Sequence, residues 1–408
     1  MCIRDRDRFK AKYSSSIKNE ENLSDFIDGF KNANFSVNSV KQSPLSKKPS
    51  PPFTTSTLQQ EASRKLGFNV SRTMQAAQKL YESGHITYMR TDSVTLSETA
   101  LSSIQKTVKS EFGEKYSKTR NFSNKNKNAQ QAHEAVRPTK FSNNVLNIDS
   151  DQSNLYDLIW KRTVASQMSD ALVDKTIVKI DSDNHEGYFQ SEGEVIRFDG
   201  FLKLYRESKD DSPQNEEKNN ILPSFSNGET IIKEKIYVTQ SFSKPPFRYS
   251  EASLVKKLEE LGIGRPSTYA PTISTVMNRK YVFKGSNNAK TRDIIQYVID
   301  SDVSKKINKE NFGSNKGKLV PSEVGLLVNQ FLTNNFKNII DYNFTASVEN
   351  EFDYIANGSK DWKSIIHNFY DPFSSVIDDV QKNAKRETGE RILGCLLYTS
   401  PSPRDTIR

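Results

Sequence analysis

Apolar side chains recur at intervals of three and four residues over much of the chain, which is the spacing of one helix face. This periodicity predicts amphipathic helices, several of which are bounded by capping residues and glycines. We place N-caps at Thr57, Ser71, Ser97 and Ser250. The predicted helices span residues 22–30, 57–66, 71–83, 97–112, 155–168, 251–261, 270–279, 324–336, 344–355 and 362–384.

Apolar and polar residues alternate, as in strands, in two separate parts of the chain. The first part is 35–40, and the second covers 177–198 and 231–241. Residues 281–320 are expected to form short strands and loops, and the Pro/Ser-rich segment 43–52 is expected to be a linker. A chain that leaves β-structure for helices and then returns indicates a discontinuous β-rich domain with a helical insertion. We therefore predict a multidomain α+β fold that is predominantly helical.

The net charge and the positions of the cysteines limit the classes of function that the chain can have. Lys and Arg number 59 and Asp and Glu number 50, so the net charge is +9, which favours a polyanionic partner. Both cysteines lie at the ends and the four histidines are scattered, so we expect no disulfide framework and no metal site in this chain. No apolar run approaches the ~20 residues of a membrane span, and no secretion signal is visible, so we expect a soluble protein without membrane contact.

The two ends of the chain, residues 1–8 and 395–408, show neither helical nor strand periodicity. They resemble translated adaptor sequence, and we interpret them as foreign tails. Finding these codons contiguous with the gene in its genome would contradict that interpretation.

The stretch from His85 to Ser93 carries the first candidate chemistry, because Tyr88 lies two residues before Arg90. A phenol with a pKa near ~10 is a poor nucleophile unless a cation or a metal stabilises the phenolate. A guanidinium offers planar donors that suit phosphate oxygens. The pair therefore suits attack by Tyr88 on a phosphodiester. A surface strand that runs into a polar turn would explain the same residues.

A second segment places His133, Glu134 and Arg137 within five residues of one another. Near a phosphodiester the guanidinium can clamp a phosphate, and the imidazole can donate a hydrogen bond or relay a proton. A polar helix end with a structural His–Glu pair is the alternative.

The glycine-rich turn at 262–269 combines free backbone N–H groups at a helix start with Arg265, Ser267 and Thr268. Such a turn predicts a phosphate cradle, although an ordinary turn between helices explains it as well. Basic and aromatic residues are also interleaved nearby, as in a single-strand-binding groove or on a solvated helix face. These residues are Arg248, Tyr249, Arg265, Tyr269, Arg279 and Tyr281.

Taken together, these segments resemble one family, the type IA DNA topoisomerases, and within it bacterial topoisomerase I. They agree with the family in order and spacing, and the resemblance extends from about Phe9 to Gly394. The residue at position 89 is Met, which resembles the topoisomerase I branch. A proline there would be similar to topoisomerase III instead. The matching segments are 51–60, 88–93, 132–138, 197–200, 245–282 and 344–349.

The resemblance implies roles for individual residues. Tyr88 would be the nucleophile that forms a 5′-phosphotyrosyl link, Arg90 would support cleavage and religation, and His133 would be an active-site histidine. The residues that would support this geometry are Thr91, Asp92, Glu134 and Arg137. Positions similar to those that line the single-strand path are Tyr81, Arg265, Ser267, Thr268 and Arg279.

The implied activity is that of an ATP-independent isomerase that cleaves one strand, passes a strand and religates, and so relaxes negatively supercoiled DNA. Its partner would be single-stranded regions of underwound DNA, and the enzyme would be a cytoplasmic, nucleoid-associated monomer. The implied cofactor is Mg²⁺, whose ligands lie in a metal-binding domain that precedes this region in the family and is not in this chain. We therefore expect a fragment that cleaves little or not at all by itself.

The family fold is a torus of domains, and this chain resembles its central region. It would contribute a β-rich arch domain (9–48 and 173–243), a helical domain with the nucleophilic tyrosine (49–172) and a helical base domain that lines the single-strand groove (244–385). Residues 386–394 would begin a truncated C-terminal region.

Other function classes predict different behaviour of Tyr88. A non-catalytic single-stranded-DNA-binding scaffold would keep the fold but form no covalent adduct. A tyrosine recombinase or a replication-initiator nuclease needs a His-Arg-Arg constellation with a tyrosine near the C-terminus, or paired histidine ligands. Neither pattern is visible in the sequence.

Overall fold

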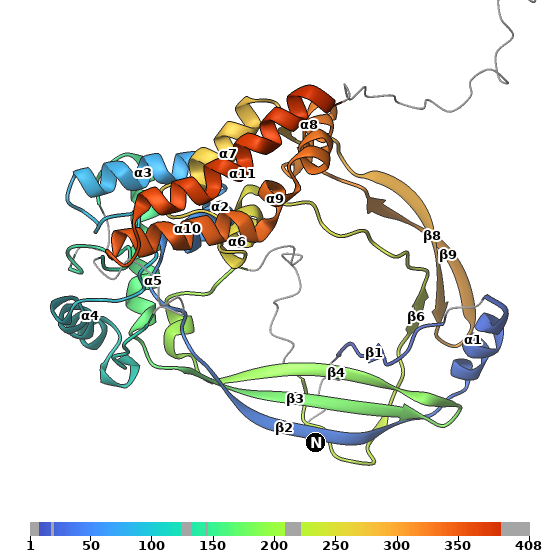
Figure 1. Ribbon diagram of the computed structural model, residues 1–408. Coiled ribbons are helices and arrows are strands. Elements are labelled where there is room, and N and C mark those ends of the chain that lie inside the picture. Colours follow the sequence, from blue (N-terminus) through green and yellow to red (C-terminus); the bar gives the residue numbers. More distant parts are fainter. Residues whose placement is uncertain (1–7, 18–19, 124–132, 143–145, 209–221, 385–408) are drawn as a thin grey trace, which may run out of the picture.

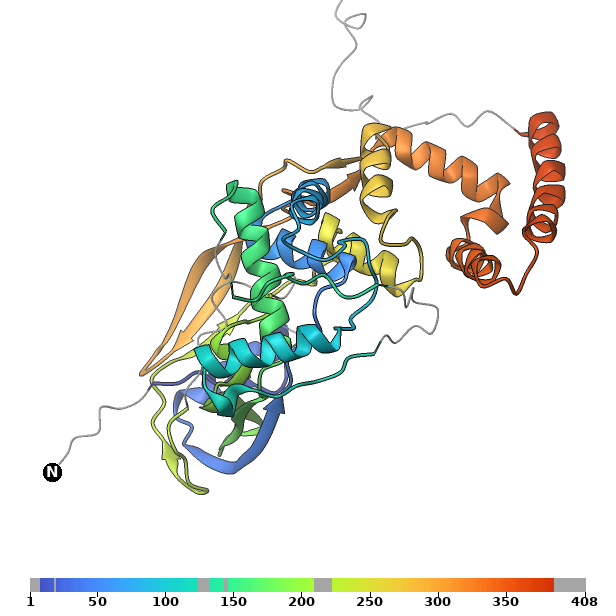
Figure 2. The same ribbon diagram turned by 90° about the vertical axis from the view of Figure 1, so that its left-hand side faces the viewer.

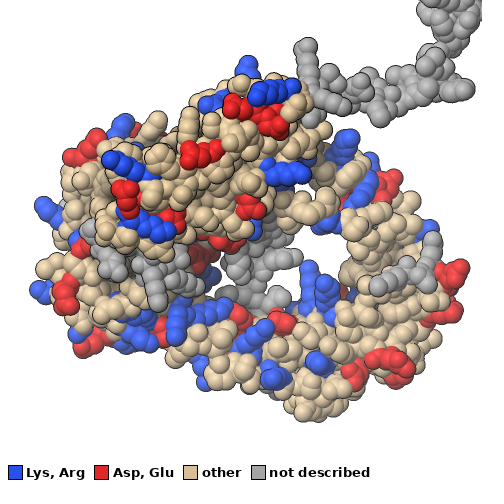
Figure 3. All heavy atoms as spheres, in the orientation of Figure 1, with Lys and Arg blue, Asp and Glu red and all other residues tan. Residues whose placement is uncertain are grey.

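The structure is a computed structural model that describes residues 8–17, 20–123, 133–142, 146–208 and 222–384. Its elements follow one another around an opening, with a helical body, a β-sheet and a β-hairpin on three different parts of the rim (Figure 1). The space-filling view shows the same opening (Figure 3). Apart from Arg8, both predicted foreign tails lie outside the described residues, as do 386–394 and most of the charged segments 121–131 and 208–220.

The sheet beside the opening is antiparallel, with the strand order β1-β4-β3-β2-β5. Its longest ladders join β3 to β2 and β4, so strands from both sides of the helical insertion meet in one sheet. The strands are β1 (Lys12–Tyr13), β2 (Phe35–Lys47), β3 (Ala171–Ser182), β4 (His185–Phe198) and β5 (Thr230–Ile231).

Strand β2 continues through residues 43–47, for which the sequence predicted a linker. Pro44 lies in the ladder opposite Asp174. Beyond Val40, β3 is the only strand that pairs with β2 in the described chain, because β5 and the residues before it bond to β2 no further than Val40. A strand with one open edge tolerates a residue that lacks an N–H group. The linker prediction was therefore wrong for this part, and the chain leaves the sheet only after Lys47.

Helices α2 to α5 pack around one apolar core. Leu58, Leu80, Ile104 and Ile159, one from each helix, are completely buried in it. Burying a side chain of this size contributes roughly 1.5–3 kcal/mol. The helices are α2 (Thr55–Leu66), α3 (Val70–Glu82), α4 (Glu98–Glu111) and α5 (Ser150–Ser166), with the 3₁₀ turn η3 (Gly200–Lys203) after β4.

Three of these helices begin earlier than predicted, and α5 begins five residues earlier, at Ser150 and not at Leu155. Thr54, not Thr57, caps α2, and Thr57 is its partner in a capping box. Asn69, not Ser71, caps α3. Ser, Thr and Asn all cap well, so a run of them does not identify the cap by itself. Two other predicted caps are confirmed, Ser97 and Ser250.

Residues 281–320 form longer strands than expected. Strands β8 and β9 pair without a register shift from Lys290 opposite Phe312 to Ile299 opposite Val303, and β6 pairs with the other edge of β8. Many of their side chains are polar, so these strands do not show the alternation of apolar and polar residues that predicts a strand. The strands are β6 (Ile236–Thr239), β7 (Val282–Lys284), β8 (Lys290–Ile299), β9 (Val303–Phe312) and β10 (Leu319–Pro321).

The tip of the β8–β9 hairpin packs against α1 (Leu23–Lys31), beside the five-stranded sheet. Ile299 is completely buried there in one core with Phe30. The Lys31 ammonium also pairs with the Asp302 carboxylate at 2.8 Å. These contacts join the hairpin to the sheet side of the molecule and close the ring of elements around the opening (Figure 1).

The remaining helices come after β6 in the chain, and α8 to α11 lie to one side of the other helices (Figure 2). The predicted helices at 324–336, 344–355 and 362–384 are confirmed within about two residues. No described helix is long and apolar enough to cross a membrane. The helices are α6 (Glu251–Glu260), α7 (Tyr269–Asn278), α8 (Glu323–Asn335), α9 (Lys337–Ile340), α10 (Tyr342–Ala356) and α11 (Trp362–Asn383).

Candidate active site

The Tyr88 stretch is a short connector between α3 and α4. Gly84, with φ +72°, lies in the left-handed region and turns the chain out of α3. The connector then runs beside the segment that follows His133, because Ile86 forms a β-bridge with Pro138. Two segments that are distant in the sequence are thereby held side by side.

Thr55, which is completely buried at the start of α2, anchors the connector. Its hydroxyl donates to the carbonyl oxygen of Met89 at 2.7 Å and accepts from the N–H of Thr91 at 2.8 Å. Met89 and Thr91 are themselves buried, whereas Arg90 between them is exposed. Asp92 is partly buried on the same connector. The loop is therefore fixed on both sides of the arginine that it presents.

An open pocket of about 490 Å³ brings six of the twelve predicted site residues together. The Tyr88 ring centroid lies 5.2 Å from that of Tyr81, in an edge-on arrangement, and 5.5 Å from that of His133. Tyr81 lies on α3 and is 41% exposed. The pocket is lined by Tyr81, Tyr88, Arg90, His133, Arg265, Pro266 and Ser267.

Three arginines near this pocket differ in what holds them. Arg137 is bound to Glu134, and Arg265 is bound to two carboxylates of α10. Arg90 is exposed, and its guanidinium makes no hydrogen bond or ion pair within the part of the chain that the structure describes. Its permanent charge and open donors therefore suit a phosphate.

Glu134 and Arg137 hold the His133 segment and are not among the lining residues of the pocket. The Glu134 carboxylate accepts hydrogen bonds from Arg137 and from Ser97, the N-cap of α4. Burial would raise the pKa of Glu134, but these hydrogen bonds and the Arg137 charge outweigh it and hold that pKa below its usual value. Nδ1 of His133 is buried and has no partner among the described residues, which leaves Nε2 to meet a ligand.

The glycine-rich turn before α7 offers fewer free donors than predicted. The Gly264 N–H donates to Glu349 Oε1 at 3.1 Å, and the Arg265 N–H donates to Thr268 Oγ1 at 2.8 Å. The predicted cradle of free N–H groups is therefore wrong for these two, because a carboxylate of α10 accepts from the first and the Thr268 hydroxyl accepts from the second. Thr268 at the start of α7 and the exposed Arg279 at its end are not among the lining residues of the pocket.

Comparison with known proteins identifies the family in which this arrangement occurs. The family described as DNA topoisomerase matches residues 3–301. The chain belongs to that family. The topoisomerase chain is 44% identical over 382 residues to DNA topoisomerase 1 of Rickettsia bellii, with 90% of this chain and 44% of that protein covered. It is 43% identical over 383 residues to DNA topoisomerase 1 type prokaryotic of Acanthamoeba polyphaga mimivirus, with 88% and 44% covered.

The fold agrees with a solved member of the family. Full-length topoisomerase I of Thermotoga maritima superposes with a TM-score of 0.70 at 33% identity, over 90% of this chain and 56% of that one. The resemblance to bacterial topoisomerase I, and the mixture of helices and sheets expected from it, are confirmed. The topoisomerase chain spans less than half the length of the two curated relatives, 44% of each.

The described residues hold no preformed cluster of metal ligands. Among them, no three histidine, cysteine or acidic side chains come together in a way that could hold a metal ion. The polar groups that the topoisomerase chain itself supplies to the pocket are two phenols, an imidazole, two guanidinium groups and a serine hydroxyl.

Glu349 offsets the charge of Arg265 beside the pocket, together with Asp353. Burial raises the pKa of Glu349, and the Arg265 charge opposes that rise. Two carboxylates against one guanidinium leave net negative charge that repels a phosphate. We expect Glu349→Gln to tighten binding of a single-stranded oligonucleotide roughly two- to fivefold at low salt and less at high salt. Fluorescence anisotropy of a labelled oligonucleotide would measure this.

The matched control for that variant is Glu351→Gln. Glu351 lies on the same helix and pairs with Lys360 at 2.6 Å, so its loss should leave the affinity unchanged. Weaker binding by Glu349→Gln would contradict the prediction and would show that Glu349 chiefly orients Arg265.

Thr55 is the residue of this site that the sequence analysis missed. The polar run from Thr54 to Thr57 indicates a helix start. The local sequence does not show which of its hydroxyl groups points into the protein. Its partner Met89 is 34 residues away. Only the match of segment 51–60 to the family marked this region at all.

Proposed function

We propose that this chain carries the nucleophile of a topoisomerase that cleaves one DNA strand through a 5′-phosphotyrosyl intermediate, passes a strand and religates, relaxing negatively supercoiled DNA. The observation that supports this is the shared pocket of Tyr88, Arg90 and His133 in a chain of the DNA topoisomerase family. The substrate is single-stranded DNA within an underwound duplex. The protein acts as a monomer at the nucleoid in the cytoplasm.

The chemistry is a transesterification in which one ester bond replaces another. The Tyr88 phenolic oxygen loses its proton to a neighbouring base or to water and attacks phosphorus, and the bond from phosphorus to the 3′ oxygen breaks. That oxygen takes up a proton and leaves as a 3′-hydroxyl, while the 5′ end stays on the tyrosine. The reverse attack by the 3′-hydroxyl restores the strand. Because the phosphotyrosine ester retains the bond energy, ATP is not required.

The neighbours of Tyr88 have separate tasks in this reaction. Arg90 binds the nonbridging phosphate oxygens and stabilises the charge that develops on them. His133 donates to the phosphate or transfers a proton at the reacting oxygens. Tyr81 packs edge-on against the Tyr88 ring and limits its orientation, which presets the direction of attack.

We further propose that the opening belongs to a torus through which DNA passes. Lys and Arg side chains, interspersed with acidic ones, surround it in the space-filling view (Figure 3). Mg²⁺ is the proposed cofactor, and residues outside this chain would hold it and help to position the phosphate. The alternative function is a non-catalytic single-stranded-DNA-binding scaffold, which the exposed Arg90 beside aromatic rings would also serve.

A covalent-trapping assay tests the proposal. End-labelled single-stranded DNA and magnesium are mixed with this chain, alone and with the metal-binding domain of a related topoisomerase added in trans. We expect a DNA–protein adduct that survives denaturation only when that domain is present. Tyr88→Phe should lower its yield by more than about a thousandfold, because the nucleophile is lost.

Tyr81→Phe is the matched control, because it alters the neighbouring ring in the same pocket without removing the nucleophile. This variant should retain the adduct. An adduct that persists in Tyr88→Phe would refute Tyr88 as nucleophile. DNA binding without any adduct, with the added domain present, would favour the scaffold.

A further inference from the structure

A second open pocket, of about 210 Å³, adjoins the catalytic pocket between α3 and α7. The two pockets share Arg90, Pro266 and Ser267. A strand whose phosphate lies at Tyr88 and Arg90 therefore passes the mouth of the second pocket. Sites for drug-sized ligands begin near ~300 Å³, so this smaller pocket suits one planar ring system and not a run of nucleotides.

The lining of the second pocket carries no charge except that of Arg90. Its apolar walls come from Met74 on α3 and from Pro266, Ala270 and Pro271 at the start of α7. A thioether packs favourably against an aromatic ring. A second phosphate would find no further cation here, whereas the faces of a base would find apolar contacts.

The polar groups of this pocket suit the edge of a base. The hydroxyl oxygens of Ser71 and Ser274 lie 3.1 Å apart and connect α3 to α7. Gln75 is exposed, and its amide makes no hydrogen bond within the described residues. A glutamine amide presents a donor and an acceptor side by side and pairs with N6 and N7 of adenine.

We propose that this pocket is a base-reading subsite. It receives the unstacked base of a nucleotide next to the phosphate that Tyr88 attacks, and Gln75 hydrogen-bonds its edge, with adenine favoured. The inference rests on the proposed function, which places the phosphate at Tyr88. It adds that residues 71–75 and 270–274 influence where the strand is cut.

Mapping of cleavage positions tests the subsite. Single-stranded DNA of random sequence is trapped as above, with the metal-binding domain in trans, and the cut sites are sequenced. We expect adenine to be enriched roughly three- to tenfold at one position beside the cut. Gln75→Ala should reduce the enrichment below about twofold while total adduct stays within about threefold. Gln105→Ala, an exposed glutamine on α4 that lines neither pocket, should change nothing.

A binding measurement that needs no cleavage separates this inference from the proposed function. Oligonucleotides with one abasic site, moved a position at a time, are titrated with this chain by fluorescence anisotropy. One abasic position should weaken binding at least threefold, and Ser274→Leu, which fills the pocket, should remove that dependence. If no adduct ever forms but this dependence is found, the proposed function fails and the base pocket stands. If adducts form but base preference and abasic dependence are unchanged in Gln75→Ala and Ser274→Leu, the subsite is refuted.

Discussion

Replacing Arg162 with alanine is expected to lower the free energy of unfolding by about 2–4 kcal/mol. The side chain lies on α5 and is only 4% exposed. Its Nε donates to the Pro51 carbonyl oxygen and its Nη1 to Glu207, each at 2.6 Å, and its guanidinium lies over the Phe53 ring. Alanine would leave a cavity, an unsatisfied carbonyl group and a carboxylate without its cation.

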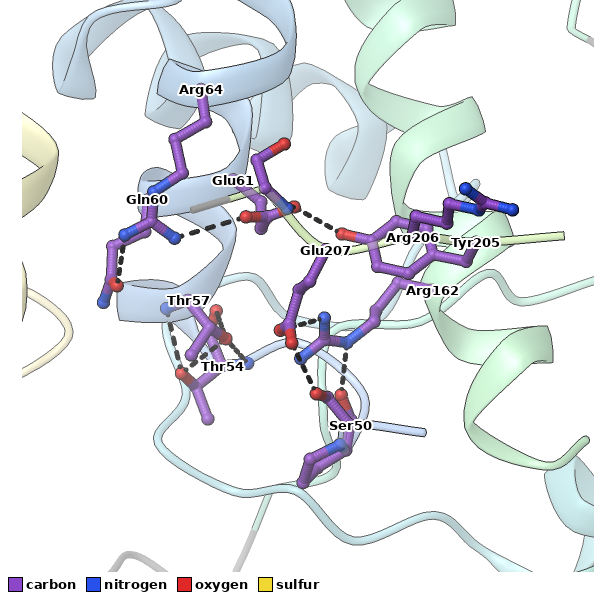
Figure 4. A network of polar contacts seen from close by, with 12 residues as sticks. Ser50, Thr54, Thr57, Gln60, Glu61, Arg64, Arg162, Tyr205, Arg206 and Glu207 are labelled. Carbon is purple, nitrogen blue, oxygen red and sulfur yellow. Dashed lines mark hydrogen bonds and ion pairs between the residues drawn. The ribbon is translucent and has the colours of Figure 1, made fainter. Parts of the chain in front are cut away.

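The network around Arg162 joins two of the connections between sheet and helices, which explains the size of this effect. Residues 50–51 lead from β2 into α2, and Glu207 follows β4 and η3 (Figure 4). Tyr205 donates a hydrogen bond to Glu61 of α2 at 2.7 Å in the same network. Loss of Arg162 therefore weakens both connections at once.

Urea denaturation followed by circular dichroism would measure the loss. Arg206→Ala is the matched control, because Arg206 is exposed and the network uses only its carbonyl oxygen, which accepts from Lys65. Arg162→Met, which keeps most of the volume, should lose less than alanine does. An unfolding free energy of Arg162→Ala within about 0.5 kcal/mol of the wild type would contradict this account.

The stabilisation should also depend on pH. Burial would raise the pKa of Glu207, but the charge and hydrogen bond of Arg162 outweigh it and hold that pKa below its usual value. A carboxyl group with a lowered pKa in the folded state stabilises the protein above the unfolded pKa of about 4.3 and loses that effect as the pH falls through the folded pKa. The difference between wild type and Arg162→Ala should therefore shrink below about pH 4.

Periodicity predicted the helices well because local sequence alone shows the apolar face of an amphipathic helix, as in α4, where Ile104 and Val108 are buried. Periodicity failed for strands that are held by hydrogen bonds to a neighbouring backbone and show no apolar face in the sequence. Strand β9 has several lysines and little apolar alternation, yet it is held along its length by hydrogen bonds to β8. Similarly, Pro44 is compatible with β2 only because that strand has an open edge there.

For the site, the sequence predicted the reactive side chains but not the residues that bind them. Tyr88, Arg90 and His133 were chosen for their chemistry and by resemblance, and they do share a pocket. Arg90 has no partner among the described residues, whereas Arg265 is bound by α10, and this difference depends on segments that are distant in the sequence. Such a difference follows from tertiary packing, and local pattern does not reveal it. The catalytic roles themselves stay predictions until the adduct is tested.

Thr55→Val is expected to lower adduct formation about 10- to 100-fold while the fold is kept. Valine has nearly the shape of threonine but cannot bond to Met89 and Thr91, whose backbone groups are buried beside it. Leaving them unsatisfied costs about 1–3 kcal/mol. The connector should shift to regain partners, and a displacement of about 1 Å at a reacting group can cost about a hundredfold in rate. Trapping with the metal-binding domain in trans would measure the yield, and urea denaturation the stability.

Thr57→Val separates the loss of stability from the loss of positioning. Thr57 lies two residues further along the same helix, and its hydroxyl serves the capping box with Thr54 and does not contact the connector. Its loss should cost about 1 kcal/mol and leave the adduct yield close to the wild type. Thr55→Ser, which keeps the hydroxyl, should restore most of the yield. If Thr55→Val forms as much adduct as Thr57→Val, the connector does not depend on this hydroxyl, and the bridge of Ile86 to Pro138 and the burial of Met89 are enough to hold it.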